Sequence, residues 1–268
     1  MKRRHFIMAS LASGTASALP GMAHAVLPST SYTTKMAAFD QPHPSDIRVH
    51  GRDAQLLLKV LSRLGRVKRV VGHGNFAVMG FDTMLKYARN YSVIGRFSPT
   101  ELDFMERVFF REASEYGFMG PKVIHELTSA PKANNLVRVR RAGGNHLFRG
   151  DSLLAFTKLQ KRVGPELVLT SGIRGVVKQF HLFLRKAARA GGDLSLASRS
   201  LAPPGYSFHG IGDFDVGQHG WGGRNFTADF VKTPVYARLE KLGVLQIRYP
   251  RDNLLGVRYE PWHIRIVA

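Results

Sequence analysis

The stretch ELVLTSGIRGVVKQFHLFLRKAARAGG, residues 166–192, joins a short apolar run to a longer helical pattern. Residues 166–170 predict a short buried strand, because an apolar run of this length is typical of one. From residue 175 to 190 apolar side chains recur on one helical face, and the glycine pair at 191–192 predicts the end of the helix. Arg174 stands between the two elements, where a strand ends and a helix begins.

The sequence around this strand and helix predicts further short elements. The expected elements are helices over 151–161 and 234–242 and strands over 206–216, 244–249 and 257–267. Glycines interrupt the first of these strands, and a turn separates the last two. Helices mixed with antiparallel strands predict an α+β domain over residues 131–268, with a small antiparallel sheet and flanking helices.

The preceding part of the chain reads as helical. Residues 54–64 have helical spacing and are followed by a glycine that predicts a stop, and residues 81–90 form a second helical stretch. Ser98 and Glu101 form a capping box around a proline, which predicts a helix running to about residue 116. We therefore expect a helical N-terminal portion over residues 49–130. Its three histidines, His50, His73 and His125, are isolated from other ligand-type residues, which favours core or surface roles.

The first 25 residues predict an export signal of the twin-arginine type. A basic start that includes Arg3 and Arg4 precedes a weakly apolar stretch, and Ala23-His-Ala25 has the form of a cleavage site. A basic N-terminal helix is the alternative. Residues 26–48 are rich in Pro, Ser and Thr and predict a linker. Export indicates a protein of the bacterial periplasm or cell envelope.

Composition limits the classes of protein. At 268 residues and 44% hydrophobic, the chain can form one large or two small domains, and no window is apolar enough to span a bilayer in the mature protein. The absence of cysteine excludes disulfides, thiolate nucleophiles and Cys-built metal sites. The net charge of +20 is spread along the chain. A basic exterior either keeps the protein soluble or attracts it to the anionic cell envelope. The predicted export makes nucleic acid an unfavoured partner, although the positive charge by itself would suit one.

Three side chains of the C-terminal half suggest a metal site when taken together. His209 and Asp215 lie on one glycine-punctuated stretch, and His263 lies on a separate expected strand. A hydrolytic zinc site uses about three His or carboxylate ligands. Glu260 precedes a proline, which keeps its backbone extended, so its carboxylate is placed to act as a base. Arg174 follows a strand and is placed to provide a cation that stabilises an oxyanion. Ordinary structural roles explain each residue equally well, so spacing alone leaves the metal site open.

Several segments in order nevertheless resemble a known family. The chain is similar, over about residues 165–268, to the VanY-type D-alanyl-D-alanine carboxypeptidases, within the zinc peptidase group that includes bacterial wall hydrolases and the hedgehog domain. The segments are SGIR at 171–174 with Gln179, PGYSFH at 204–209, FDV at 214–216, IRYP at 247–250 and YEPWHIR at 259–265. No counterpart of the helical N-terminal portion is evident in the minimal family domain.

The resemblance implies roles for individual residues and a Zn²⁺ cofactor. The implied zinc ligands are His209, Asp215 and His263. The resemblance further implies that Glu260 is the catalytic base and that Arg174 stabilises the transition state. It also implies substrate contacts for two more residues, Ser207 and Gln179.

One departure from the family pattern affects the assignment of the third ligand. The family places its Asp seven positions after the first His, whereas Asp215 is six after His209. Asp213 is therefore a rival, because both carboxylates of Asp-x-Asp face one way on a strand. His219 is a more distant alternative.

The function implied by the resemblance is a zinc-dependent peptidase that hydrolyses the terminal D-amino-acid bond of peptidoglycan stem peptides, a D,D-carboxypeptidase. The alternatives are an L,D-carboxypeptidase, a peptidoglycan endopeptidase, or a non-catalytic zinc-retaining wall-binding protein. The presence of Glu260 and Arg174 together favours catalysis over simple binding. The role of residues 49–130 and the oligomeric state stay open.

Overall fold

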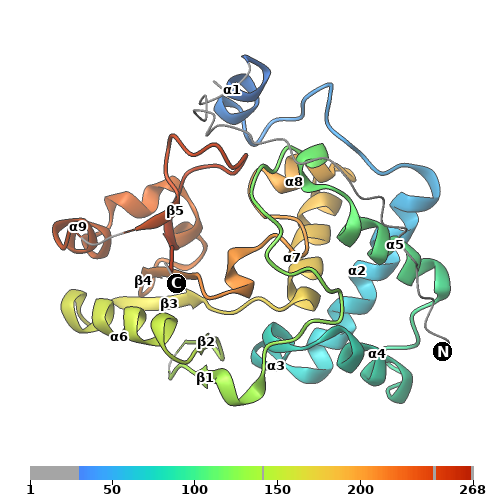
Figure 1. Ribbon diagram of the computed structural model, residues 1–268, viewed down its shortest axis with the longest axis horizontal. Coiled ribbons are helices and arrows are strands. Elements are labelled where there is room, and N and C mark those ends of the chain that lie inside the picture. The colour runs from blue at the N-terminus through green and yellow to red at the C-terminus, as the bar shows by residue number, and fades with distance from the viewer. Residues whose placement is uncertain (1–29, 141, 244–245, 267–268) are drawn as a thin grey trace, which may run out of the picture.

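The computed structural model describes residues 30–140, 142–243 and 246–266, so the predicted export signal lies outside the described residues. Figure 1 shows helices gathered on one side of the molecule and a small sheet with two flanking helices on the other. Strands and helices are mixed in the C-terminal half, which confirms the α+β prediction. Within the described parts of the chain, no helix is long and apolar enough to cross a membrane.

A four-stranded antiparallel sheet forms the centre of the C-terminal half. Its strand order is β3-β4-β6-β5, with bounds β3 (Leu167–Ser171), β4 (Phe214–Gln218), β5 (Ile247–Tyr249) and β6 (Glu260–Ile264). β4 lies between β3 and β6, where Asp215 pairs with Ser171 on one side and with His263 on the other. The pairing of β4 with β6 therefore brings together two residues that are 48 positions apart in the sequence, Asp215 and His263.

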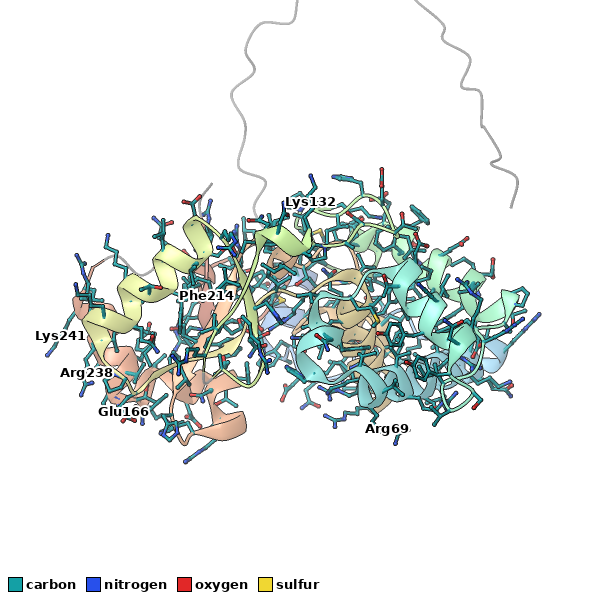
Figure 2. All side chains as sticks on the ribbon, turned by 90° about the horizontal axis from the view of Figure 1, so that it is seen from below. Arg69, Lys132, Glu166, Phe214, Arg238 and Lys241 are labelled. Atoms are coloured by element: carbon teal, nitrogen blue, oxygen red, sulfur yellow. The ribbon has the colours of Figure 1, made fainter. Side chains whose placement is uncertain are left out.

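One face of this sheet is apolar and is covered by α6 (Asp151–Val163) and α9 (Pro234–Lys241). Phe214 is fully buried there and meets Phe156 of α6 edge-on, with ring centroids 5.9 Å apart. Figure 2 shows Phe214 inside this part of the molecule and Lys241, Arg238 and Glu166 at its outer end. Because side chains alternate along a strand, the residue after Phe214 turns toward the opposite face.

The helical side has its own apolar core. Its helices are α2 (Gly51–Val71), α3 (His73–Val78), α4 (Phe81–Asn90), α5 (Pro99–Phe110), α7 (Val176–Arg189) and α8 (Leu194–Ser198). Phe180 and Phe183 of α7 are fully buried in this core, against side chains of the helices from residues 51–110. The predicted domain boundary between residues 130 and 131 stays a prediction. α7 lies in the sequence of the predicted C-terminal domain, but its side chains pack in the same core as the helices of residues 51–110.

Two predicted helix ends are wrong, and one cap is confirmed. The first helix does not stop at Gly65, since α2 continues to Val71. Apart from its chain neighbours and the backbone of its own helix, no atom of the described residues lies within 4 Å of the position that a Cβ of Gly65 would take, so the surroundings do not crowd this residue. The capping box of Ser98 and Glu101 is formed as predicted. The helix that it opens ends at Phe110, and a separate 3₁₀ turn covers Ala113–Tyr116.

The strand predictions hold in part. Within 206–216 only the last three residues form a strand, because residues Phe208–Gly210 make a 3₁₀ turn. The last strand is shorter than predicted, and residues 244–245 and 267–268 of the expected strands lie outside the described residues. A two-stranded hairpin of β1 (Leu136–Arg138) and β2 (His146–Phe148) was not predicted, since its strands are too short to show a pattern.

The predicted linker contains structure in its described part. Residues 30–37 form α1 (Thr30–Ala37), which lies above the loop between β5 and β6 in Figure 1. Further along, the buried carboxylate of Asp46 forms an ion pair with the buried guanidinium of Arg199 at 2.7 Å. Arg199 also donates to the carbonyl oxygens of Phe39 and Gln41. This segment is therefore tied to the body of the protein.

Candidate metal centre

Three of the predicted residues meet at one buried point. His209, Asp215 and His263 each present one ligand-type atom, and these atoms lie within 4.8 Å of one another. Nε2 of His209 is 3.2 Å from Oδ1 of Asp215, and Nδ1 of His263 is 3.7 Å from the same oxygen. At most 3% of each residue is exposed.

Local structure aims these side chains at each other. Asp215 follows Phe214 on β4 and so faces away from the apolar core, toward its pairing partner His263 on β6. His209 lies on the 3₁₀ turn before β4, and its Nδ1 is 2.8 Å from the carbonyl oxygen of Gly172. That contact assigns the proton to Nδ1, so Nε2 offers its lone pair to the centre.

Two atoms at this point lack the partners that buried polar atoms normally have. Nε2 of His209 and Oδ1 of Asp215 are buried and make no hydrogen bond within the described residues. An unpartnered buried polar atom costs free energy. Two imidazole nitrogens and a carboxylate oxygen form a donor set that zinc accepts. The residues present therefore fit a zinc ion.

Asp213 lies on the far side of His263 and is fully engaged. Its carboxylate accepts two hydrogen bonds from Arg248, at 2.7 and 3.0 Å, and one from the backbone N–H of Ile266 at 2.8 Å. Its Oδ2 is also 3.2 Å from Nε2 of His263. Asp213 thus orients the ring of His263 so that Nδ1 faces Asp215, and this geometry favours Asp215 over Asp213 as the third ligand. The distant alternative, His219, is exposed at the end of β4.

The pKa values follow from burial and from these contacts. Burial lowers the pKa of His209 to about 4, and the nearby charge of Arg174 acts in the same direction. Burial alone would raise the pKa of Asp215, but the neighbouring His209 and Arg174 hold it well below its usual range. For His263, burial would lower the pKa, but the hydrogen bonds to Asp213 and Glu260 raise it to about 9. A neutral His209 and an ionised Asp215 suit metal binding, whereas His263 has to release its proton when a metal binds.

Glu260 begins β6 beside the three ligand atoms. Its Oε2 is 3.2 Å from Nδ1 of His263, and its Oε1 is 3.7 Å from Nε of Arg258. Only 7% of the residue is exposed. A carboxylate that lies next to the ligand atoms is placed to exchange a proton with a reacting group.

Arg174 enters the centre from the junction of β3 and α7. Its Nε donates to Oγ of Ser171 at 3.0 Å, and its Nη2 donates to Oδ2 of Asp215. Its backbone N–H donates to the carbonyl oxygen of His209 at 3.3 Å. These contacts hold a cation at the edge of the centre, and its predicted role toward an oxyanion stays a prediction.

The two predicted substrate contacts differ in their surroundings. Gln179 is buried, and its amide is engaged at both ends, since Nε2 donates to the carbonyl oxygen of Arg174 at 2.6 Å and Oε1 accepts from Gly205 at 2.8 Å. These bonds position the backbone of Arg174, a role that the sequence did not indicate. The hydroxyl of Ser207 makes no hydrogen bond to any described residue and stays available to a ligand. Substrate contact remains a prediction for both residues.

Sequence reasoning missed the pair of Arg248 and Asp213. Arg248 lies in the IRYP segment, whose only signal was its place in the resemblance. Its guanidinium stacks over the ring of Phe208, 4.0 Å from the centroid, while it holds Asp213. No spacing rule could pair these residues, because Asp213 directly precedes β4 whereas Arg248 lies on β5.

Comparison with known proteins agrees with this arrangement. The family model "VanY: D-alanyl-D-alanine carboxypeptidase" matches residues 150–268, which contain every residue of the centre. A search of curated proteins finds no match.

Three solved structures are similar over half of the chain. A mutant of the vancomycin resistance D,D-pentapeptidase VanY from the VanB-type resistance cassette, in complex with Zn(II), is 26% identical, with 50% of this chain and 78% of that chain covered and a TM-score of 0.39. VanYB in complex with D-alanine-D-alanine is 26% identical over 50% and 77%, also with a TM-score of 0.39. The LdcB LD-carboxypeptidase is 20% identical over 50% and 69%, with a TM-score of 0.40. On the match of the family model, residues 150–268 of this chain are similar to the VanY family of D-alanyl-D-alanine carboxypeptidases.

Proposed function

We propose that this protein is a zinc-dependent peptidase that removes the terminal D-amino acid from peptidoglycan stem peptides, as a D,D-carboxypeptidase. One observation carries the proposal: unpartnered buried atoms of His209 and Asp215 meet His263 beside Glu260 and Arg174. The family of residues 150–268 supports the reaction, and the neighbour described in complex with Zn(II) agrees with the metal.

The proposed zinc ligands are Nε2 of His209, Oδ1 of Asp215 and Nδ1 of His263, the atoms that converge in the structure. When bound, zinc supplies Lewis-acid activation of water and of a carbonyl group. The side chains bring the rest of the chemistry. Asp213 keeps His263 oriented, and the carbonyl oxygen of Gly172 does the same for His209.

In the proposed mechanism Glu260 is the general base. Its carboxylate takes a proton from the attacking water and then delivers it to the amine of the leaving D-amino acid. Arg174 faces the same point from the end of β3, and its guanidinium stabilises the negative charge that develops on the scissile carbonyl oxygen. Gln179 holds the backbone of Arg174 in place for this task.

We further propose that the protein acts outside the cytoplasm, in the periplasm or cell envelope, after export by the segment at residues 1–25. The substrate of the VanY family lies there, and the N-terminal sequence has the pattern of a twin-arginine signal. The labelled basic residues Arg69, Lys132 and Lys241 lie far apart in Figure 2, which agrees with a diffuse attraction to the anionic envelope instead of one nucleic-acid site.

The test is release of D-alanine from a synthetic pentapeptide that ends in D-Ala-D-Ala. We expect the purified protein to release D-alanine, to lose this activity with a chelator and to recover it with zinc. Tetrapeptides and cross-linked dimers tested in parallel separate the D,D-carboxypeptidase from an L,D-carboxypeptidase and from an endopeptidase. Stoichiometric zinc without cleavage of any of these substrates would instead favour a wall-binding protein.

A further inference from the structure

The two carboxylate oxygens of Glu260 face different partners. Oε2 lies 3.2 Å from Nδ1 of His263, and Oε1 lies 3.7 Å from Nε of Arg258. This Nε is buried and has no hydrogen-bond partner among the described residues, so no other acceptor competes for it. The last torsion of a glutamate side chain is broad, and a cation beside one oxygen restricts its rotation. Arg258 therefore keeps Oε2 directed at the centre.

Arg258 is itself fixed from several sides. Its backbone N–H donates to the carbonyl oxygen of Arg199 at 2.9 Å, and its Nη2 donates to the carbonyl oxygen of Phe226 at 2.9 Å. Its guanidinium lies over two aromatic rings, 5.1 Å from the centroid of Trp262 and 5.5 Å from the centroid of Phe39. Cation–π contacts at such distances stabilise the position of a guanidinium group.

Phe39 is placed by a buried ion pair of the N-terminal segment. Asp46 accepts two hydrogen bonds from the guanidinium of Arg199, at 3.1 and 2.7 Å, and at most 3% of either side chain is exposed. The same guanidinium donates to the carbonyl oxygens of Phe39 and Gln41, at 3.1 and 3.0 Å. Because the donors of a guanidinium form a rigid fork, these bonds fix the path of residues 39–46 and hold the ring of Phe39 in place.

These contacts form one continuous path from residues 39–46 to the proposed general base. Arg199 binds the backbone of both Phe39 and Arg258, and Arg258 lies against Glu260. The sequence presents residues 39–46 as part of a linker, and the match with the family model begins only at residue 150. The support of Glu260 thus comes in part from a segment outside that match.

From this geometry we infer that Arg258 is a positioning residue for Glu260, and that residues 39–46 act on the catalytic centre through Arg258. The inference rests on the proposed function, in which Glu260 is the general base. Oε2 takes the proton from the attacking water and passes it to the leaving amine, while Arg258 keeps Oε1 in place. A displacement of about 1 Å in a catalytic group costs up to about 100-fold in rate.

A purely structural role of Arg258 has different consequences. If Arg258 only stabilised the fold, its loss would lower Tm and leave the kcat of the folded protein unchanged. A positioning role lowers kcat instead. The KM and the zinc affinity then stay close to those of the wild type, because the proposed substrate contacts and zinc ligands are other residues.

The experiment measures D-alanine release by the zinc-loaded protein from a D-Ala-D-Ala pentapeptide, with kcat and KM determined separately. We expect Arg258→Met to lower kcat by about 10–100-fold and to change KM by less than about threefold. Arg258→Lys keeps the positive charge and should restore kcat to within about fivefold of the wild type. Arg162→Met, at an exposed arginine on α6, is the matched control and should leave kcat unchanged. Chelator competition and thermal unfolding give the zinc affinity and the Tm of each variant.

Phe39→Leu tests whether the N-terminal segment acts through Arg258. The variant keeps most of the apolar volume but removes the aromatic face, so we expect kcat to fall by about 3–10-fold. In Arg258→Met protein the same change should have no further effect on kcat, because two substitutions that act through one contact are not additive. Asp40→Asn, exposed on the same segment, should leave kcat unchanged in both backgrounds.

The outcomes are distinct. If the wild type releases D-alanine and the folded Arg258→Met protein keeps its kcat, the inference is overturned and the proposed function stands. An equal loss of kcat in Arg258→Lys, with lower Tm and zinc affinity in both variants, indicates a structural role and overturns it as well. Additive effects of Phe39→Leu and Arg258→Met overturn the part that concerns residues 39–46. Arg258→Gln replaces Arg258→Met if the latter does not fold. If the wild type releases no amino acid from any stem peptide, both the inference and the proposed function fail.

Discussion

The two ends of α7 differ in how well their side chains are satisfied. From the middle of the helix toward its C-terminal end, Phe183, Leu184 and Ala187 are fully buried among the side chains of the helical core. Just before its N-terminal end, Arg174 pairs with Asp215, whose other carboxylate oxygen has no hydrogen-bond partner among the described residues. One helix therefore stabilises the fold at one end and holds a reactive arrangement at the other, which is a common division between stability and function.

The distribution of unpartnered atoms sharpens this contrast. In the helical core the buried Glu101 is paired with Arg63 and caps its own helix. Within the described residues, none of the unpartnered buried atoms lies on α2 to α5. They belong to Asn145, His146, Thr170, Ser200, His209, Asp215 and Arg258. Two of them, Nε2 of His209 and Oδ1 of Asp215, lie in the proposed centre, where a metal can satisfy them.

Glu260→Gln should have the largest effect. Because the amide cannot take a proton from water, we expect kcat to fall by about 100-fold or more, while zinc binding remains. Stopped assays of D-alanine release and metal analysis measure the two effects. Glu240→Gln, an exposed residue on α9, is the matched control and should keep full activity. Wild-type turnover in the Glu260 variant would exclude Glu260 as the base.

Phe183→Ala tests the part of α7 that lies in the helical core. Removing a fully buried ring leaves a cavity, so the free energy of unfolding should fall by about 3–5 kcal/mol. The zinc affinity of the folded protein should stay close to that of the wild type, because the ring lies in the helical core. Urea denaturation and zinc titration measure these quantities. A parallel loss of zinc affinity would show that the two ends of α7 are not separate.

Asp213→Asn tests the support of His263. The variant removes the charge that orients the ring through Nε2, so we expect zinc affinity to fall by about 10–100-fold. Competition with a chromogenic chelator measures this affinity, and the exposed Asp252→Asn serves as control. If Asp213→Asn abolished zinc binding altogether while Asp215→Asn did not, the two carboxylates would have to exchange roles.

The pH dependence of the metal-free protein should show the smallest effect. The pKa of His263 is about 9 in the folded protein and about 6.5 when unfolded, so its contribution to stability is complete below about pH 6.5 and is lost as pH rises toward 9. We expect Tm of the chelator-treated wild type to decline over this range. The decline should be weaker in His263→Gln protein, and an equal decline in both would assign it to other groups.

Local sequence determined much of this protein. The capping box of Ser98 and Glu101 and the helical face of residues 175–190 identified their helices, because caps and periodicity act between residues near in the chain. The order of the SGIR, PGYSFH and YEPWHIR segments predicted the similarity to the VanY family, and this resemblance implied His209, Asp215 and His263, which the structure brings together.

Only the tertiary structure decided how these residues are supported. The choice between Asp213 and Asp215 depends on Arg248, which comes from another strand, and the engagement of Gln179 depends on the position of Gly205. A pattern in the sequence records which residues are near in the chain, whereas hydrogen-bond partners and unpaired charges are set by strand pairing and packing across long separations.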